Sequence, residues 1–583
     1  MIGLIAITAA GRASAAQLAA AWPGQTRTYE APAKQALHRA WAECDQLVCF
    51  LAVGATARLI APLLDSKWID PAVVCVDEPA RYAVALVGGH AASGNELCTR
   101  VAAVFGARAI ITTATDATGL PGLDTLGWPT EGALAAVSRA MLDGEPVDLE
   151  TDATWPIPSF PVTVGGAGQY RIVVTDRIVP VDENTVVLRP PSLVVGVGAS
   201  RGVDAEEVLA LIGEALAVGG LAQGSVTSLA TVEAKADEAG IKEAARMRGW
   251  PLVAYPAERL AAVPVPNPSD AARAAVGTPS VAEAAALVSG DVLVVPKRKS
   301  GMATVALARI RPRGRLAVIG LGPGDRDLVT PRAIAELRRA SVVVGLDRYI
   351  DQIRDVLRPG TRVLSSGLGQ EEERAFTAVL QARGGHAVAL IGSGDAGVYA
   401  MGSPALAMAG TDIDVVGVPG ITAGLAAASL LGAPLGHDHA LISLSDLHTP
   451  WEVIERRVRA AAEGDFVVIF YNPRSADRDW QLGAALAILA EHRQPSTPVG
   501  VVRDAYRPGQ QVLLTTLAEL DPAAVDMRGV VIVGSASTLN VADRMVTPRG
   551  YKWQPRSRSA PAKGAGPVFA PVQSMQYAHG AAR

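Results

Sequence analysis

Short apolar runs alternate with alanine-rich stretches along most of the 583-residue chain. In the first region the apolar runs are bounded by turn residues, and we expect a helix over 94–105 between two of them. Strands bounded in this way and separated by helices are typical of parallel α/β layers. We therefore predict buried strands over residues 3–8, 46–54, 72–77, 82–89 and 107–114.

Further along the chain, a proline-rich stretch at 155–161 precedes a small β-rich region, in which we predict strands over 170–177 and 184–191. A new α/β unit begins at 192, and its helix over 204–216 has Asp204 as a cap and acidic residues in its first turn. The tail is rich in Pro, Ala, Ser and Arg and has no period, so we expect disorder there. The predicted parts are an α/β domain (1–135), a β-rich middle domain (136–191), an α/β domain (192–310), a basic linker (311–315), a C-terminal domain (316–551) and the tail (552–583).

The segment LAVIGLGPGDRDLVT, residues 316–330, is the most informative in the chain. An apolar strand runs into a turn with Gly320, Gly322 and Gly324, and a helix follows with Thr330 as its N-cap and Pro331 at its first position. Glycines at the carboxyl end of a strand let a ligand lie against bare backbone, which predicts a nucleotide-like ligand. The spacing is not G-x-G-x-x-G, and no G-K-[ST] follows, which excludes a P-loop. A tight strand-to-helix connection without a ligand is the alternative.

Composition narrows the functional classes. A formal net charge of -4 gives no electrostatic case for nucleic acid or an anionic membrane surface. Cys44, Cys49, Cys75 and Cys98 form no C-x-x-C pair, so we expect buried free thiols rather than a disulfide or zinc site. The first 15 residues lack the basic region of a signal peptide, and no apolar run reaches the roughly 18 residues that a membrane span needs. We expect a cytoplasmic protein with no membrane partner and no resident metal.

Three further glycine-containing strand ends follow the opening turn, in the segments 389–405, 415–435 and 465–475. The motifs G-x-G-P-G-D, G-D-A-G-V-Y, P-G-I-T-A and Y-N-P, in this order, resemble the tetrapyrrole methyltransferases that use S-adenosyl-L-methionine. The segments 436–457, 471–478 and 546–551 resemble the precorrin-3B C17-methyltransferases within that family. The resemblance spans about 316–551 and implies a two-lobed α/β fold. His439 and His448 depart from the pattern, which has an aromatic and an aliphatic residue there.

The resemblance implies a cofactor site built from loops at strand ends. An aspartate in these loops can accept hydrogen bonds from a ribose or an amino group, or only from local N–H groups. The matching positions are Gly322, Pro323, Gly324, Ser393, Gly394, Asp395, Val398, Thr422, Ala423, Tyr471 and Thr515.

Methyl transfer from a sulfonium needs positioning and exclusion of water more than acid–base help. In the family, C-17 methylation accompanies contraction of the macrocycle, which calls for a group that handles a hydroxyl proton. Candidates in one loop-like stretch are Asp446, His437, His439 and His448, although a structural or solvated role is the commoner one for such residues. The substrate carries many carboxylates, so arginines should line its binding trough. Candidates near strand ends are Arg348, Arg474, Arg478 and Arg503, and each of them can equally be an ordinary surface arginine.

The N-terminal half carries a second resemblance. Segment 87–128, with 195–202, 228–241 and 277–287, resembles the cobalamin-biosynthesis hydrolase that opens the lactone of cobalt-precorrin-5A and releases acetaldehyde. Lactone opening and the following carbon–carbon cleavage need a base and an oxyanion stabiliser. His90, Glu96 and Asp116 are the candidate groups, with backbone N–H donors from the Gly88–Gly89 turn beside them. A helix-capping or core histidine is the alternative for His90. Ala199 stands where the pattern has a cysteine.

The two resemblances together predict a fused cobalamin-pathway enzyme. Its C-terminal domain methylates a corrinoid precursor at C-17, and its N-terminal block is a lactone hydrolase or a descendant of one. Two alternatives stay open: an N-terminal block that only binds corrinoid, and methylation at another position or of another tetrapyrrole. Whether the substrate already holds cobalt is open, an iron–sulfur cluster is not expected because no cysteine follows Cys98, and the family implies a homodimer through the methyltransferase domain.

Overall fold

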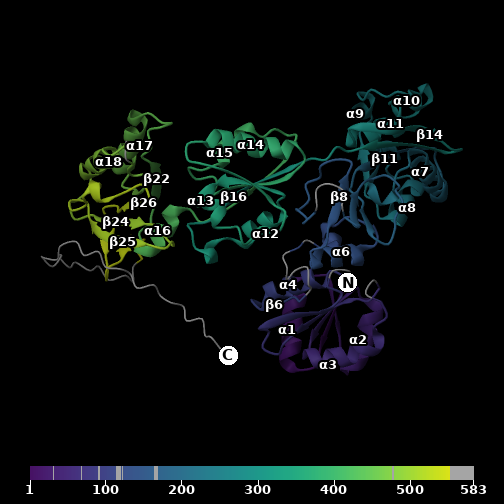
Figure 1. Ribbon diagram of the computed structural model, residues 1–583, viewed down its shortest axis with the longest axis horizontal. Coiled ribbons are helices and arrows are strands. Elements are labelled where there is room, and N and C mark those ends of the chain that lie inside the picture. The colour runs from purple at the N-terminus through teal and green to yellow at the C-terminus, as the bar shows by residue number, and fades with distance from the viewer. Residues whose placement is uncertain are drawn as a thin grey trace. The chain divides into compact units, whose positions relative to one another are not determined.

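The computed structural model describes residues 1–30, 32–66, 69–89, 92–112, 120, 122–162, 168–475 and 478–551. The chain forms two compact units, drawn in Figure 1. One consists of residues 1–312 with 358–360, and the other of residues 313–357 with those from 361 onwards.

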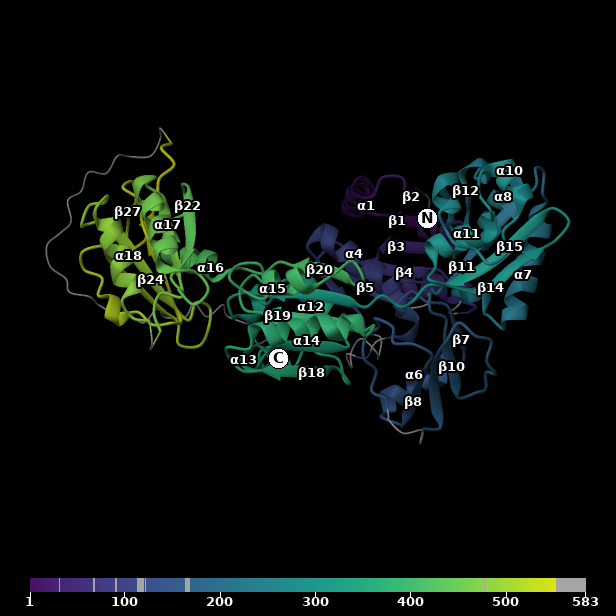
Figure 2. The same cartoon turned by 90° about the horizontal axis from the view of Figure 1, so that it is seen from above.

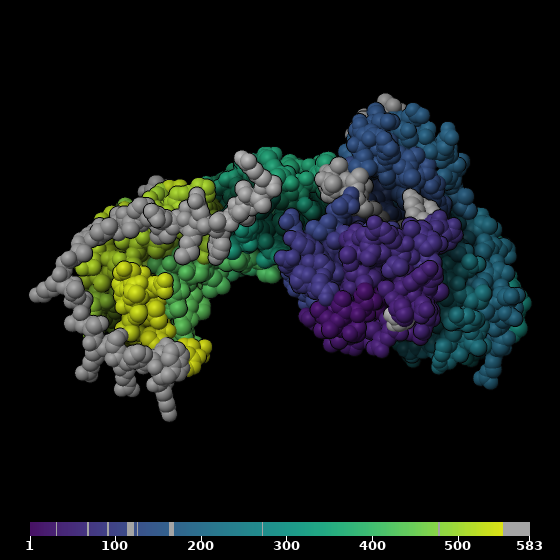
Figure 3. All heavy atoms as spheres, turned by 90° about the horizontal axis from the view of Figure 1, so that it is seen from below, coloured from purple at the N-terminus to yellow at the C-terminus, as the bar shows by residue number. Residues whose placement is uncertain are grey.

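The first unit begins with a six-stranded sheet in the order β2-β1-β3-β4-β5-β6. Neighbouring strands are parallel except β4 and β5, which are antiparallel. Figure 2 shows β1, β3, β4 and β5 side by side. The domain built around this sheet is coloured purple in Figure 3 and presents a rounded surface there. The elements are β1 (Ile2–Ala6), α1 (Ala9–Ala21), β2 (Thr26–Tyr29), α2 (Ala33–Glu43), β3 (Gln46–Phe50), α3 (Val53–Ile60), β4 (Ala72–Val76), β5 (Tyr82–Val87), α4 (Gly94–Phe105) and β6 (Arg108–Ile110).

A second sheet of the first unit has the order β7-β10-β9-β8. The strands β8, β9 and β10 are parallel, and only β7 runs against its neighbour. Because β7 spans residues 130–132, this sheet includes a strand from before the domain boundary expected at 135/136. The elements are β7 (Thr130–Gly132), α6 (Leu134–Asp143), β8 (Val147–Thr151), β9 (Tyr170–Val174) and β10 (Thr185–Leu188).

A third sheet completes the first unit in the order β13-β12-β11-β15-β14. Asp204 caps α7 as predicted, because its carboxylate accepts a hydrogen bond from the Glu206 N–H. A Cβ on Gly196 would lie 1.9 Å from the Ala282 carbonyl oxygen, so only glycine lets α11 pack this closely on β11. The elements are β11 (Leu193–Ala199), α7 (Ala205–Gly219), β12 (Val226–Val232), α8 (Ala239–Arg248), β13 (Leu252–Tyr255), α9 (Ala257–Ala261), α10 (Asp270–Val276), α11 (Val281–Ser289), β14 (Val292–Lys299) and β15 (Ala303–Arg309).

The second unit begins with a fully parallel sheet in the order β18-β17-β19-β16-β20. Helices cover both faces, α12 and α13 on one and α14 and α15 on the other (Figure 1). Thr330 caps α12 and Pro331 is its first residue, which confirms the predicted helix start. The elements are β16 (Arg315–Gly320), α12 (Pro331–Arg339), β17 (Val342–Leu346), α13 (Asp347–Asp351), β18 (Arg362–Ser366), α14 (Glu371–Arg383), β19 (Ala387–Gly392), α15 (Gly402–Met408) and β20 (Asp414–Val418).

A second lobe of this unit is built on the sheet β22-β23-β26-β24-β25. Helix α16 packs on one face, and α17 and α18 pack on the other. A small sheet of β21, β28 and β27 lies beside them. The elements are α16 (Ala423–Leu431), β21 (Gly432–Ala433), β22 (His439–Ser443), α17 (Trp451–Glu463), β23 (Val467–Tyr471), α18 (Gln481–Ala490), β24 (Pro498–Arg503), β25 (Gln511–Thr516), β26 (Gly529–Val533), β27 (Leu539–Asn540) and β28 (Met545–Val546).

The expected parallel α/β layers are confirmed for the first lobe of the second unit. They are wrong for the third sheet of the first unit, where β15 runs antiparallel to β11 and β14, and for the second lobe. In the five-stranded sheet of that lobe only β22 and β23 are parallel, since β26 runs antiparallel to β23 and β24, and β24 and β25 form an antiparallel hairpin. No helix among the described residues is long and apolar enough to span a membrane.

Candidate functional site

The predicted cofactor loops meet at one edge of the first parallel sheet in the second unit. The strands β19, β16 and β20 are adjacent and parallel, so the loops that follow them leave the sheet side by side. The Gly322 N–H donates to the Gly394 carbonyl at 3.0 Å, and the Gly394 N–H donates back to the Gly322 carbonyl at 2.8 Å. The first and second predicted loops are therefore directly hydrogen-bonded.

The glycines of these loops are required mainly by contacts between the loops. A Cβ on Gly420 would lie 2.1 Å from the Gly394 carbonyl oxygen, and one on Gly320 would lie 2.6 Å from the same atom. Gly322 has a φ of +74°, and its Cβ would meet the Leu328 carbonyl. From the sequence, these glycines are expected to give a ligand access to the backbone. In the structure the close approach of the chain to itself already requires glycine at these three positions.

Asp395 links the second loop to the third. Its Oδ1 accepts a hydrogen bond from the Gly397 N–H at 2.8 Å, and its Oδ2 accepts one from the Gly420 N–H at 3.0 Å. The local role considered from the sequence is therefore present. Each carboxylate oxygen can accept a second hydrogen bond, so both oxygens keep acceptor capacity for a ligand.

The beginning of α16 is tied to the end of β23 through Tyr471. The Tyr471 hydroxyl accepts a hydrogen bond from the Gly424 N–H at 2.6 Å and lies 2.7 Å from the Thr422 Oγ1. Burial raises the pKa of Tyr471 above its ordinary value, although these hydrogen bonds act in the opposite direction. Tyr471 therefore stays protonated near neutral pH and holds the buried Thr422 in place.

Arg507, which no sequence motif marks, reaches the same loops from the second lobe. It lies in the connection between β24 and β25. Its Nε donates to the Pro323 carbonyl at 2.5 Å and its Nη2 donates to the Ser393 Oγ at 2.8 Å. A Cβ on Gly324 would lie 2.4 Å from the Arg507 Cγ. The only sequence signal is the polar turn A-Y-R-P-G-Q after an apolar strand.

The other predicted cofactor positions divide into two groups. Val398 lies in the second loop and Ala423 is the first residue of α16, and both are half-buried. Thr515 pairs with Val499, whose side chain lies in the core beside α17 and α18. Because paired residues in a sheet point to the same face, Thr515 lies on the face opposite α16. The structure does not bring its side chain together with Thr422 and Tyr471.

The four proton-handling candidates do not share one loop, and that expectation is wrong. His439 is the first residue of β22, and His437 precedes it, whereas Asp446 and His448 follow the other end of the strand. The histidines are exposed, and Asp446 accepts a hydrogen bond from the Gln481 amide at 2.8 Å. A strand of five residues spans about 16 Å, so the two pairs lie at opposite ends.

The predicted trough arginines make contacts within the second unit. Arg478 is 7% exposed and donates to the Leu444 and Asn472 carbonyls, so it fixes strand ends instead of facing solvent. Arg503 pairs with Asp526 at 2.8 Å, and Arg474 donates to the Ala523 carbonyl at 2.7 Å. Arg348 is exposed, and its guanidinium stacks on the Tyr349 ring.

In the N-terminal half, His90 and Asp116 lie outside the described residues. Glu96 is exposed in the first turn of α4. The Gly88 and Gly89 carbonyls accept hydrogen bonds from the N–H groups of Gly94 and Asn95, so this turn closes onto the start of α4. The N–H groups of the Gly88–Gly89 turn stay a prediction as oxyanion donors.

The cysteines are buried and free, which confirms the expectation for these four thiols. Burial raises the pKa of Cys49, Cys75 and Cys98. In the part of the chain that the structure describes, no three His, Cys, Asp or Glu side chains are grouped to hold a metal ion.

Comparison with known proteins identifies three regions. Family models match at residues 315–521 (Tetrapyrrole (Corrin/Porphyrin) Methylases), 193–308 (Cobalamin synthesis G C-terminus) and 35–116 (Cobalamin synthesis G N-terminal). A Salmonella typhimurium protein named "Probable cobalt-factor III C(17)-methyltransferase" is 47% identical over 239 residues, 40% of this chain and 99% of that protein.

Two further proteins are similar to this chain. A Sinorhizobium protein named "Precorrin-3B C(17)-methyltransferase" is 39% identical over 249 residues, 41% of this chain and 97% of that protein. A crystal structure of the methyltransferase CobJ is 40% identical and covers 40% of this chain and 100% of its own, with a TM-score of 0.39. Since the chain spans nearly all of the Salmonella protein at 47% identity, it belongs through its C-terminal unit to the tetrapyrrole methylase family, here fused to the two cobalamin synthesis G regions.

Proposed function

We propose that the C-terminal unit transfers a methyl group from S-adenosyl-L-methionine to C-17 of precorrin-3B, or of its cobalt-containing counterpart, in cobalamin biosynthesis. One observation carries the proposal at the level of the site. The loops after β16, β19 and β20 meet through direct hydrogen bonds, and Tyr471 and Arg507 reach them from the second lobe. The names of the two C17-methyltransferase relatives support the choice of substrate.

The residues present suit this donor. When bound, S-adenosyl-L-methionine supplies a methyl group that its positively charged sulfur already activates. Asp395 keeps acceptor capacity for a ribose hydroxyl or an amino group, and the Ser393 and Thr422 hydroxyls lie in the adjacent loops. Arg507 and Tyr471 fix the loops, so the donor and the ring carbon would be held in line. These roles are proposals for this chain.

Of the four proton-handling candidates, we favour Asp446. It follows the carboxyl end of β22, next to the end of β23 that carries Tyr471. Gln481 donates to its carboxylate, and the Arg478 Nε lies 3.8 Å from it, so the carboxylate is held in one place. His437 and His439 lie at the opposite end of β22.

The test is a reaction of the intact chain with methyl-labelled S-adenosyl-L-methionine and two acceptors, precorrin-3B and cobalt-factor III. Product NMR and mass spectrometry locate the methyl group and report ring contraction. The proposal predicts label at C-17 with at least one acceptor, and the preferred acceptor shows whether cobalt is already inserted. Label at another ring position, or no transfer to either acceptor, would contradict it.

A second function is favoured by the two cobalamin synthesis G regions. We propose that the N-terminal unit opens the lactone of cobalt-precorrin-5A and releases acetaldehyde. The alternative is a module that binds corrinoid without catalysis. Acetaldehyde release from cobalt-precorrin-5A by the intact chain would support the hydrolase, and corrinoid binding without acetaldehyde would support the module. A homodimer through the methyltransferase unit and a cytoplasmic location stay predictions.

A further inference from the structure

The first unit contains a cavity of about 390 Å³ that none of the predicted site residues lines. Its volume lies in the range of small-molecule sites in proteins. Charged walls come from Asp152, Arg177, Arg309 and Arg311, and apolar walls include Trp155 and Pro190. The cavity therefore offers both charge and apolar surface to one ligand.

The position of the cavity follows from the second sheet of the unit. The parallel strands β8, β9 and β10 are in register, with Thr151 beside Val174 and Val174 beside Leu188. The residues that follow these strands, among them Asp152, Arg177 and Pro190, therefore share the carboxyl edge of the sheet. In parallel sheets this edge is where ligands bind.

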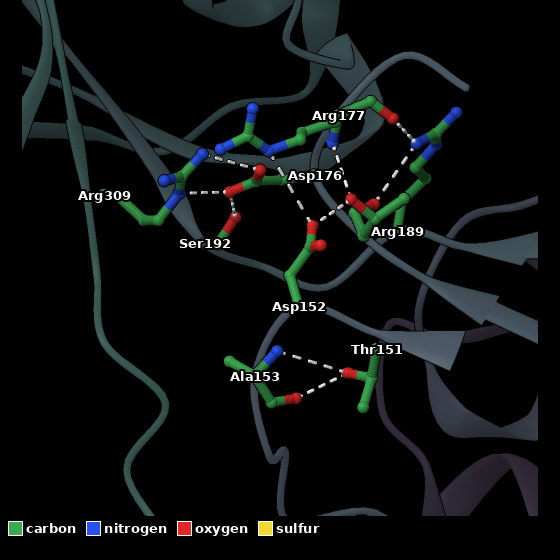
Figure 4. Close-up of polar contacts among 9 residues, drawn as sticks. Thr151, Asp152, Ala153, Asp176, Arg177, Arg189, Ser192 and Arg309 are labelled. Carbon is green, nitrogen blue, oxygen red and sulfur yellow. Dashed lines mark hydrogen bonds and ion pairs between the residues drawn. The ribbon is translucent and has the colours of Figure 1, made fainter. Parts of the chain in front are cut away.

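Two ion pairs, each with one buried partner, hold the walls in place. Asp176 is 5% exposed, and its carboxylate accepts hydrogen bonds from Arg309 at 2.6 and 2.8 Å and from the Ser192 hydroxyl at 2.7 Å. The buried Arg189 donates to the Arg177 carbonyl at 2.5 Å and pairs with Glu131 through two hydrogen bonds. Figure 4 shows the contacts of Asp176 with Arg309 and Ser192 and the hydrogen bond from Arg189 to the Arg177 carbonyl. These contacts fix the chain around the cavity at Asp176, Arg177 and Arg309.

The remaining ion pair is long, and Asp152 also accepts a hydrogen bond from the Thr175 hydroxyl. The side chain of Arg177 is 61% exposed, that of Asp152 is 57% exposed, and the Arg177 Nε lies 4.0 Å from the Asp152 Oδ2. The Arg309 guanidinium neutralises Asp176 in a close two-point contact. Two arginines, Arg177 and Arg311, thus face one exposed carboxylate, and the cavity has an excess of positive charge.

We propose that this cavity binds a carboxylate group of an amphipathic acid, with Arg177 as its principal partner. A guanidinium holds a carboxylate through two parallel hydrogen bonds, and Trp155 and Pro190 provide apolar surface for the body of the ligand. The negative charge of Asp152 repels an anionic ligand and lowers the affinity of the cavity for it. The site goes beyond both proposed activities. Only the choice of a corrinoid as the probe rests on the proposed function.

The test is calorimetric titration of the intact chain with cobyrinic acid, a corrinoid with carboxylate arms, and with cobinamide, in which amides replace them. We expect Arg177→Gln to weaken cobyrinic acid binding about tenfold at one class of sites. Asp152→Asn should strengthen the same binding, because it removes a negative charge at nearly constant volume. A variant outside the cavity, Arg248→Gln in the same unit, should leave this class unchanged.

Opposite shifts from Arg177→Gln and Asp152→Asn distinguish a ligand site from a loss of folding, since misfolding lowers affinity in both variants. Weaker binding of cobinamide at this class of sites would support recognition of carboxylates. Titrations that neither cavity substitution alters, or cobinamide binding with the same dependence on Arg177, would overturn the proposal. The methylation assay reports on the other unit, so its failure would leave this result standing.

Discussion

At the residue scale, Arg507 links the two lobes of the methyltransferase unit. Its guanidinium donates to Pro323, 184 residues earlier in the chain, and to Ser393. Both acceptors belong to the loops in which the family pattern places the cofactor. The planar guanidinium fits two acceptors at once, which a lysine ammonium on a flexible stem does not reproduce. Arg507 is therefore a positioning residue for these loops.

Arg507→Gln should raise the dissociation constant for S-adenosylhomocysteine about tenfold, because hydrogen bonds from a charged donor to the two loops are lost. Arg507→Lys should recover only part of the affinity. Isothermal titration calorimetry measures both. Arg456→Gln, on the exposed face of α17, is the matched control and should bind as the wild type does. Unchanged affinity in Arg507→Gln would remove Arg507 from the site.

Tyr471→Phe should lower the free energy of unfolding by about 1–2 kcal/mol, since the Gly424 N–H and the Thr422 hydroxyl lose their partner. Burial raises the Tyr471 pKa in the folded state. The stability that the protonated hydroxyl contributes is therefore fully present below about pH 10, the ordinary value, and is lost as the pH rises further. Denaturant unfolding should show a constant difference between wild type and variant from about pH 7 to 9 that shrinks above about pH 10. A difference that grows in that alkaline range would contradict this assignment.

At the element scale, three strand ends and their loops form one closely packed edge. The loops after β16, β19 and β20 approach each other backbone to backbone at Gly320, Gly394 and Gly420. A Cβ on Gly417, only three residues before Gly420, would meet no atom within 4 Å, and Gly417 lies in an exposed part of β20. The same substitution at these two glycines therefore separates loop packing from the general effect of a methyl group.

Gly420→Ala should lower the free energy of unfolding of the second unit by about 3 kcal/mol, because the new Cβ would overlap backbone atoms that have little room to move. It should also abolish S-adenosylhomocysteine binding. Gly417→Ala should leave both stability and binding close to wild type. Chemical denaturation and calorimetry give the two readouts. Equal effects of the two substitutions would show that the edge is not packed as the structure has it.

Local features of these elements could be predicted, and long-range ones could not. The cap and first residue of α12 and the bounds of α4 follow from residues within one turn of the helix end, so the sequence was sufficient. The separation of His439 from Asp446 by β22 was missed because histidines near glycines and prolines are typical of loops. Arg507 was missed because its acceptors lie more than a hundred residues away. The loop-to-loop role of the glycines likewise depends on strand order, which no local pattern contains.

At the scale of the whole molecule, the chain carries two compact units with separate cores and separate proposed chemistries. Each unit contains a residue whose replacement should act on that unit alone. Gly420 lies in the packed edge of the second unit, and Arg189, 2% exposed, holds the carboxyl edge of the middle sheet in the first. Arg189→Met replaces the arginine with an apolar side chain of similar length and leaves the Thr175 and Arg177 carbonyls without this donor.

Differential scanning calorimetry should therefore show two components in the unfolding of the intact chain. Gly420→Ala should lower the transition temperature of one component, and Arg189→Met should lower that of the other, by several degrees each. Activity gives an independent check. Gly420→Ala should abolish methyl transfer while acetaldehyde release persists. Arg189→Met should lower acetaldehyde release while methyl transfer persists. The two substitutions touch no common residue, so their effects should add in the double variant. If instead either substitution shifted both components by the same amount, the units would unfold as one cooperative body, and the fusion would be a single folding unit with two sites.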